Sequence, residues 1–140
     1  MKLDIDLKSG AGPIIFGMTR IQVRSVIEGK DEIFRRVDGE SSDSDFFESQ
    51  GIFVYYDNEG RVEAIEVSSP SEAWLEGVDL LSVSSEKAKK IFLSKDCKAE
   101  LEEDTVISKK IGLGIFDPML NEDHSHSVES VIVFAEGYYR

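Results

Sequence analysis

The chain has 140 residues, enough for one ordinary domain that removes about two thirds of its surface from water on folding. Its 28 acidic and 16 basic residues give a net charge of −12. Nucleic-acid binding and docking to anionic lipid both need basic surface, so the charge argues against both. It allows a basic protein as partner, and the alternative is that the acidic surface simply keeps the protein soluble. No apolar run approaches the roughly 20 residues that cross a bilayer, so we predict no membrane contact.

The first ten residues and the cysteine content bear on the cellular compartment. The opening sequence MKLDIDLKSG carries Asp4 and Asp6 where a signal peptide needs an apolar run. Cys97 is the single cysteine, so no internal disulfide can form, as expected in a reducing compartment. We therefore predict a cytoplasmic protein, and for Cys97 a partly buried structural thiol.

A strand and a capped helix are predicted at the start of the chain. Residues 2–7 alternate apolar and polar side chains, which is the period of a half-buried strand. Residues 13–27, PIIFGMTRIQVRSVI, predict a short apolar strand, a glycine turn and an amphipathic helix. Thr19 can cap this helix and Gln22 can complete a capping box. We expect the helix to end near Gly29.

The clearest local pattern of the first half is a β-hairpin. Residues 33–37 predict a short strand and residues 38–44 a polar loop. After them, 51–56 is rich in β-branched and aromatic residues, and 61–67 alternates apolar and polar side chains. The four residues between these runs have turn composition. The pattern therefore predicts a hairpin with a four-residue loop.

The second half predicts a similar series of elements. Residues 68–77, which include Trp74, permit either one helical turn or an extended connector. Ser84 can cap a second helix, whose apolar stripe contains Ala88 and Phe92. Short strands are predicted at 78–81 and 105–107, and a second hairpin at 111–116 and 127–134.

The two halves match as segments. We predict an α+β fold of two tandem units, each a helix followed by antiparallel strands, with the helices packed against the antiparallel sheet. The chain is expected to be one domain, 1–140, with two candidate sub-repeats at 8–70 and 76–138. The alternative to a duplication is coincidence, because any two helix-hairpin units share similar spacings between their elements. Met18, Thr19, Val23, Val26 and Ile27 align with Val83, Ser84, Ala88, Ile91 and Phe92, Tyr55-Tyr56-Asp57 aligns with Ile115-Phe116-Asp117, and Val62-Glu63 aligns with Val128-Glu129.

Candidate catalytic and metal-binding groups are few. His124 and His126 lie with two acidic residues in one polar loop, a pattern that permits a metal clamp but is more typical of a solvated loop. Gly112 and Gly114 lie in a predicted strand without the further glycine and helix of a dinucleotide site, so a bulge or a close backbone approach explains them. We predict no cofactor and no catalytic residue, and we favour a protein that is not an enzyme.

An acidic segment with aromatic neighbours is the main candidate site. Residues 37–60 contain acidic residues and no Lys or Arg, and aromatic anchors ringed by charge are common in protein interfaces. Arg20 and Arg24, one helical turn apart, can instead pair with this segment within the same chain. The predicted partner-binding residues are Asp38, Asp43, Asp45, Phe46, Phe47, Glu48 and Tyr55.

One stretch resembles a known repeat. Residues 13–20, PIIFGMTR, with Val23 four residues after the threonine, resemble the motif of the beta-lactamase inhibitory protein and the SmpA/OmlA outer-membrane lipoproteins. In those families a Gly-Met-Thr or Gly-Met-Ser turn starts a helix that packs on an antiparallel sheet. The inhibitory protein is a tandem duplication that presents its sheet face to another protein. The match covers 13–27 only, and Leu81-Ser82-Val83-Ser84 replaces the motif in the second half.

A second similarity covers more of the chain but implies no activity. The segments GIFVYYDNEGRVEAIEV, GVDLLS and VIVFAEGYY are similar to small bacterial proteins of unknown function. The extracellular setting of the inhibitory protein and the lipoproteins does not transfer, because the chain shows no lipobox cysteine and no disulfide.

These observations predict a non-catalytic protein-binding module. It would act as an immunity or inhibitor protein that neutralises a basic enzyme, such as a secreted nuclease, through an acidic surface. The alternative is a small-molecule- or metal-binding domain, or an enzyme of unknown activity, that uses the cleft between the halves with His124 and His126. The chain is expected to be a monomer or, through unpaired edge strands, a homodimer.

Overall fold

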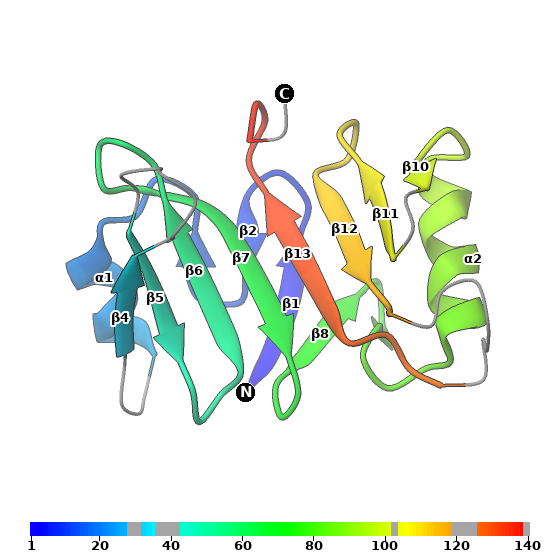
Figure 1. Ribbon diagram of the computed structural model, residues 1–140, viewed down its shortest axis with the longest axis horizontal. Coiled ribbons are helices and arrows are strands. Elements are labelled where there is room, and N and C mark those ends of the chain that lie inside the picture. The colour runs from blue at the N-terminus through cyan, green and yellow to red at the C-terminus, as the bar shows by residue number, and fades with distance from the viewer. Residues whose placement is uncertain (28–31, 36–42, 102–103, 119–125, 139–140) are drawn as a thin grey trace.

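In the part of the chain that the structure describes, the fold combines two mostly antiparallel sheets with two short helices, as the α+β prediction requires (Figure 1). The computed structural model describes residues 1–27, 32–35, 43–101, 104–118 and 126–138. The larger sheet has eight strands in the order β10-β11-β12-β13-β7-β6-β5-β4. Its strands are β4 (Glu32–Arg35), β5 (Asp43–Phe47), β6 (Ile52–Tyr56), β7 (Val62–Ser68), β10 (Glu100–Leu101), β11 (Thr105–Ser108), β12 (Leu113–Phe116) and β13 (Ser130–Phe134).

The order of the large sheet follows the two halves of the chain. Strands β4 to β7 form one antiparallel meander, and β10 to β13 form a second. The two meanders meet at β7 and β13, which pair antiparallel from Ala64↔Phe134 to Ser68↔Ser130. Each meander follows a helix in the sequence, α1 (Arg20–Val26) or α2 (Ser85–Lys95). Both predicted hairpins, β6 with β7 and β12 with β13, are therefore confirmed.

A five-stranded sheet in the order β3-β2-β1-β8-β9 forms a second layer. Its β8 lies within residues 68–77, so the extended alternative for this segment is correct. The pairing of β1 with β8 is parallel and joins Leu3 to Ala73 and Asp4 to Trp74. The strands are β1 (Lys2–Asp6), β2 (Gly10–Ala11), β3 (Ile14–Ile15), β8 (Glu72–Leu75) and β9 (Val78–Asp79).

Both helices begin at the predicted caps. Thr19 and Gln22 form the complete capping box of α1, and the Ser84 side chain accepts a hydrogen bond from the backbone N–H of Lys87 at the start of α2. Such caps are each worth about 1 kcal/mol. Helix α1 ends at Val26 with Ile27 as its C-cap, before Gly29, which lies outside the described residues. No helix in the described part of the chain has the length and apolar character needed to span a membrane.

The large sheet has two different faces. In Figure 1 it lies toward the viewer, with β1, β2 and β8 behind its centre and the helices near its ends. Alternate strand residues point back into this layer and are fully buried, as Val54, Val67 and Val133 show. We call this the inner face. The opposite side, the outer face, carries half-buried side chains from six strands, namely Phe46, Phe53, Tyr55, Glu66, Thr105, Ile107, Phe116 and Ile132.

Candidate functional site

Three aromatic rings form a ladder on the first half of the outer face. Phe46 of β5 and Phe53 of β6 are directly paired across the strands, and their rings stack with centroids 4.1 Å apart. Tyr55, two residues further along β6, stacks on Phe53 at 6.2 Å. Alternation places these three side chains on one face, and cross-strand aromatic pairs of this kind stabilise a sheet. The ladder is therefore a half-buried, largely apolar surface.

A carboxylate lies at the centre of the outer face, where the two meanders meet. The Tyr55 hydroxyl donates a hydrogen bond to Oε1 of Glu66 over 2.8 Å, and the Ser130 hydroxyl donates to Oε2 over 2.7 Å. Glu66 thus joins β6, β7 and β13. Within the described part of the chain, no Lys or Arg forms an ion pair with it. The two hydroxyls hold the carboxylate in place without neutralising its charge.

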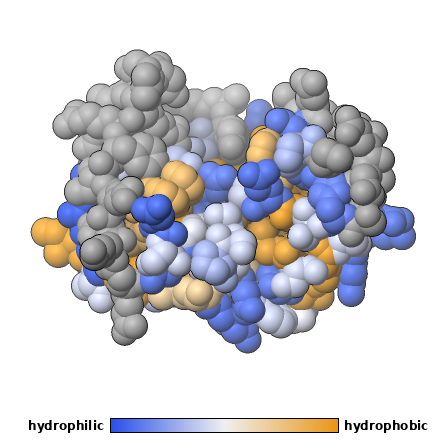
Figure 2. Space-filling model, turned by 60° about the horizontal axis from the view of Figure 1, so that its bottom comes forward, coloured by the Kyte–Doolittle hydropathy of each residue, from blue (hydrophilic) through white to orange (hydrophobic). Residues whose placement is uncertain are grey.

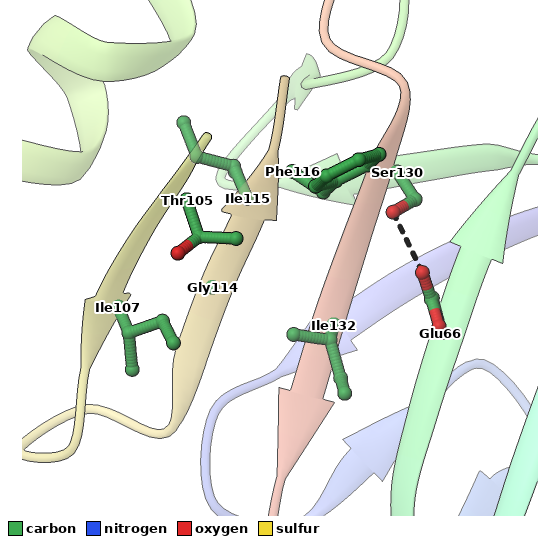
Figure 3. Close-up of a pocket in the computed structure, with 8 residues that line it drawn as sticks. All are labelled: Glu66, Thr105, Ile107, Gly114, Ile115, Phe116, Ser130 and Ile132. Atoms are coloured by element: carbon green, nitrogen blue, oxygen red, sulfur yellow. Dashed lines mark hydrogen bonds between the residues drawn. The ribbon is translucent and has the colours of Figure 1, made fainter. Parts of the chain in front are cut away.

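A depression of about 170 Å³ lies beside this carboxylate on the second half of the outer face (Figure 3). Gly114 forms its floor between Ile107 and Ile132, because a Cβ there would lie 3.0 Å from Cγ2 of Ile132 and 3.4 Å from Cγ1 of Ile107. The missing side chain therefore opens the depression. Its lining residues are Glu66, Thr105, Ile107, Gly114, Ile115, Phe116, Ser130 and Ile132.

Comparison with known proteins adds no family to this geometry. No family model, curated protein or solved structure matches the chain. The resemblance of residues 13–20 to the Gly-Met-Thr repeat therefore stays a prediction. What the site can do has to be inferred from its own contacts, charge and shape.

The outer face combines apolar and charged surface. Figure 2, in which the bottom of the molecule comes forward and the outer face is seen obliquely, shows orange, apolar surface in separate areas with hydrophilic surface between them. The aromatic ladder and the lining of the depression are its apolar components, and Glu66 is the charged group between them. Aromatic side chains around a polar centre are typical of surfaces that bind other proteins.

Two of the predicted partner-binding residues lie together on this face. Phe46 and Tyr55 are both members of the aromatic ladder. Glu48 is exposed in the turn after β5. Asp38 lies outside the described residues, as does the side chain of Asp43, whose backbone begins β5.

Asp45 and Phe47 do not fit a partner contact. Both point to the inner face, where Asp45 is fully buried and Phe47 is 1% exposed. The physical reason is strand alternation, since β5 begins at Asp43 and residues 43 and 44 are not in a loop as predicted. Neither side chain has enough exposed surface to reach a second molecule.

The buried Asp45 is paired within its own chain. Nη2 of Arg24 donates to its Oδ1 over 3.0 Å, Nε of Arg20 lies 3.2 Å from the same oxygen, and the Tyr56 hydroxyl donates to Oδ2 over 2.7 Å. Burial raises the pKa of Tyr56 above its ordinary value, and the hydrogen bond to Asp45 raises it further. The predicted intrachain pairing of Arg20 and Arg24 with the acidic segment is thus present at Asp45, so this carboxylate is not available to a partner.

The structure describes one of the two histidines named for the alternative function. His124 lies outside the described residues, and Nε2 of His126 lies 2.6 Å from Oδ1 of Asp117. Ser85 donates to the other oxygen of Asp117, so the carboxylate stands between the serine and the histidine, whereas nucleophile activation needs the histidine in the middle. The described residues contain no group of three or more metal-ligating side chains. Cys97 is exposed, so the prediction of a partly buried thiol is wrong.

Most of the outer-face site was not singled out from the sequence. The alternation of residues 61–67 indicates that Glu66 lies on the polar side of its strand. Nothing local indicates that Ser130, 64 residues later, donates to it. The sequence predicts a bulge or a close backbone approach at Gly114. Its φ is not in the left-handed region, so the backbone does not require glycine there, and the consequence of the missing side chain is the depression.

Proposed function

We propose that the chain is a non-catalytic protein-binding module that engages a basic protein through the outer face of its eight-stranded sheet. The observation that carries this proposal is the central carboxylate of Glu66, held by two hydroxyls between an aromatic ladder and an apolar depression. Aromatic anchors around a charged centre supply apolar contact and a fixed register at the same time. We propose that the chain acts in the cytoplasm as an inhibitor or immunity protein.

The net charge of the chain supports a basic partner. A net charge of −12 attracts a cationic molecule over a Debye length of about 8 Å at physiological salt. Because the proposed contact is centred on Glu66 and not on the acidic residues of 38–48, the charge of the whole molecule would steer the encounter and Glu66 would fix its register. Association should therefore slow as salt is raised. A rate indifferent to salt would contradict the basic partner.

We also propose that the two meanders are tandem units related by duplication, as the sequence alignment predicts. Burial supports it, since the aligned residues Val23 and Ala88 are fully buried, and Ile27 and Phe92 nearly so. The pairing of β7 with β13 is centred on Glu66↔Ile132, a separation of 132 − 66 = 66 residues, which equals the 128 − 62 offset of the aligned valines. The first unit has a bulge at Tyr55/Tyr56, and a relative whose halves align along their full length would test the duplication.

Site-specific photo-crosslinking in the source cells tests the binding face. The photoreactive residue p-benzoylphenylalanine would replace Phe53 or Ile107 on the outer face and, as controls, Ile21 or Lys90 on the two helices. Ile21 is 80% exposed and Lys90 is also exposed, so all four positions are open to reaction to different degrees. We expect one discrete adduct from the outer-face positions alone. Equal adducts from the helix positions, or adducts from those positions only, would contradict the proposal.

A further inference from the structure

We infer that the depression beside Glu66 binds the guanidinium group of an arginine side chain of the partner. The inference rests on the proposed function, because it names the chemical group that the outer face recognises. It adds a defined subsite whose ligand can be tested without the partner. Its three components are the carboxylate, the apolar walls and the glycine floor.

The carboxylate geometry favours a planar, forked cation. Each oxygen of Glu66 accepts one hydroxyl hydrogen bond, and a carboxylate oxygen has a second lone pair. The hydroxyls of Tyr55 and Ser130 come from the neighbouring strands on either side, which fixes the carboxylate plane. A guanidinium offers two parallel N–H groups at the spacing of two carboxylate oxygens, whereas an ammonium acts as a point charge.

The walls suit the rest of an arginine side chain. Figure 3 shows Ile132 between Gly114 and Glu66, Phe116 beside Ser130, and Thr105 and Ile107 across from Glu66. An aromatic ring can stack on the guanidinium plane, and isoleucine side chains can cover its three methylene groups. Partial burial lowers the effective dielectric constant around Glu66, so its attraction for a cation is stronger here than at a fully exposed carboxylate.

Titration with blocked amino acids, followed by ¹H–¹⁵N NMR, tests the inference on the intact chain. The probes are Nα-acetyl-arginine amide, the lysine equivalent, and the citrulline equivalent, which has nearly the shape of arginine without its charge. We expect saturable shifts at the backbone amides of Thr105, Gly114 and Ile132, with a dissociation constant on the order of 1 to 10 mM for the arginine probe. Citrulline should bind at least about tenfold more weakly, and lysine more weakly than arginine.

Matched variants separate the subsite from general acidity. Glu66→Gln should weaken the arginine probe at least about tenfold, whereas Glu86→Gln, which removes the same charge from exposed α2, should change it less than about twofold. Equal binding of citrulline or lysine, or an unchanged constant in Glu66→Gln, would overturn the inference. The citrulline comparison uses the unmodified chain, so it decides the matter even if a variant fails to fold.

The two proposals can fail separately. Crosslinks from the outer face without arginine binding would leave a protein-binding face and remove the guanidinium subsite. Arginine binding without outer-face crosslinks would retain the subsite and contradict the proposed protein partner.

Discussion

Asp45→Asn should destabilise the fold strongly, because Asp45 is a fully buried carboxylate that two arginines and a tyrosine share. The substitution keeps the size of the side chain and removes its charge. Hydrogen bonds to charged groups contribute about 1.5 to 3 kcal/mol each, and breaking a buried ion pair costs about 3 to 5 kcal/mol. The side chains of Arg20 and Arg24 are 27% and 33% exposed, so water recovers part of the loss. We expect the free energy of unfolding to fall by about 3 kcal/mol.

Urea denaturation at pH 7, followed by far-UV circular dichroism, measures this change. The matched control is Asp4→Asn, which makes the same substitution at an exposed position of β1 and should change the free energy of unfolding by less than about 0.5 kcal/mol. The m-value should not change, because both variants expose the same surface on unfolding. Equal midpoints for the two variants would refute the reasoning that assigns Asp45 to the core.

Three further predictions concern pH and shape. Burial and Asp45 raise the pKa of Tyr56, so its contribution to the stability of the fold is complete below the unfolded phenol pKa of about 10 and falls above it by up to about 1.4 kcal/mol per pH unit. Between pH 10 and about 11.5, Tyr56→Phe should therefore lose less stability than the wild type. Parallel losses in the two proteins would contradict this. The Ser108 hydroxyl lowers the pKa of Asp96 more than the backbone N–H of Lys98 does. Ser108→Ala should therefore raise the pKa of Asp96 in a ¹³C NMR titration. An unchanged pKa would mean that a group other than Ser108 lowers it. Gly114→Ala should weaken the blocked arginine probe at least about fivefold in the NMR titration, since its Cβ occupies the floor of the depression; an unchanged constant would mean the probe binds elsewhere.

Local signals predicted the helix starts and the hairpins because those features depend on neighbouring residues. The Thr19 capping box is encoded within four positions, and the β6–β7 hairpin within about one strand length on each side of a turn. The parallel pairing of β1 with β8 joins residues 70 apart, such as Lys2 and Glu72, and no local pattern specifies it. For the same reason the sequence could not decide between a helical turn and an extended connector at residues 68–77, which contain β8.

The predicted site failed where burial overrode residue type. The sequence predicts Asp45 as a partner-binding residue because acidic residues are rarely buried without a partner. That partner is supplied by Arg20 and Arg24 of α1, a tertiary contact that the sequence allowed as an alternative but did not decide. Phe46 and Phe47 are adjacent and chemically alike, and only the strand register separates the outer face from the core.

The affinity of the crosslinked partner for two isoleucine variants tests the central claim most directly. Ile107→Asn alters the outer face beside the depression, and Ile21→Asn makes the same change on exposed α1. Titration calorimetry should show binding at least about tenfold weaker for Ile107→Asn, a loss of about 1.4 kcal/mol or more, and a change within about twofold for Ile21→Asn. Equal affinities for the two variants, or a larger loss for Ile21→Asn, would contradict the outer face as the binding surface.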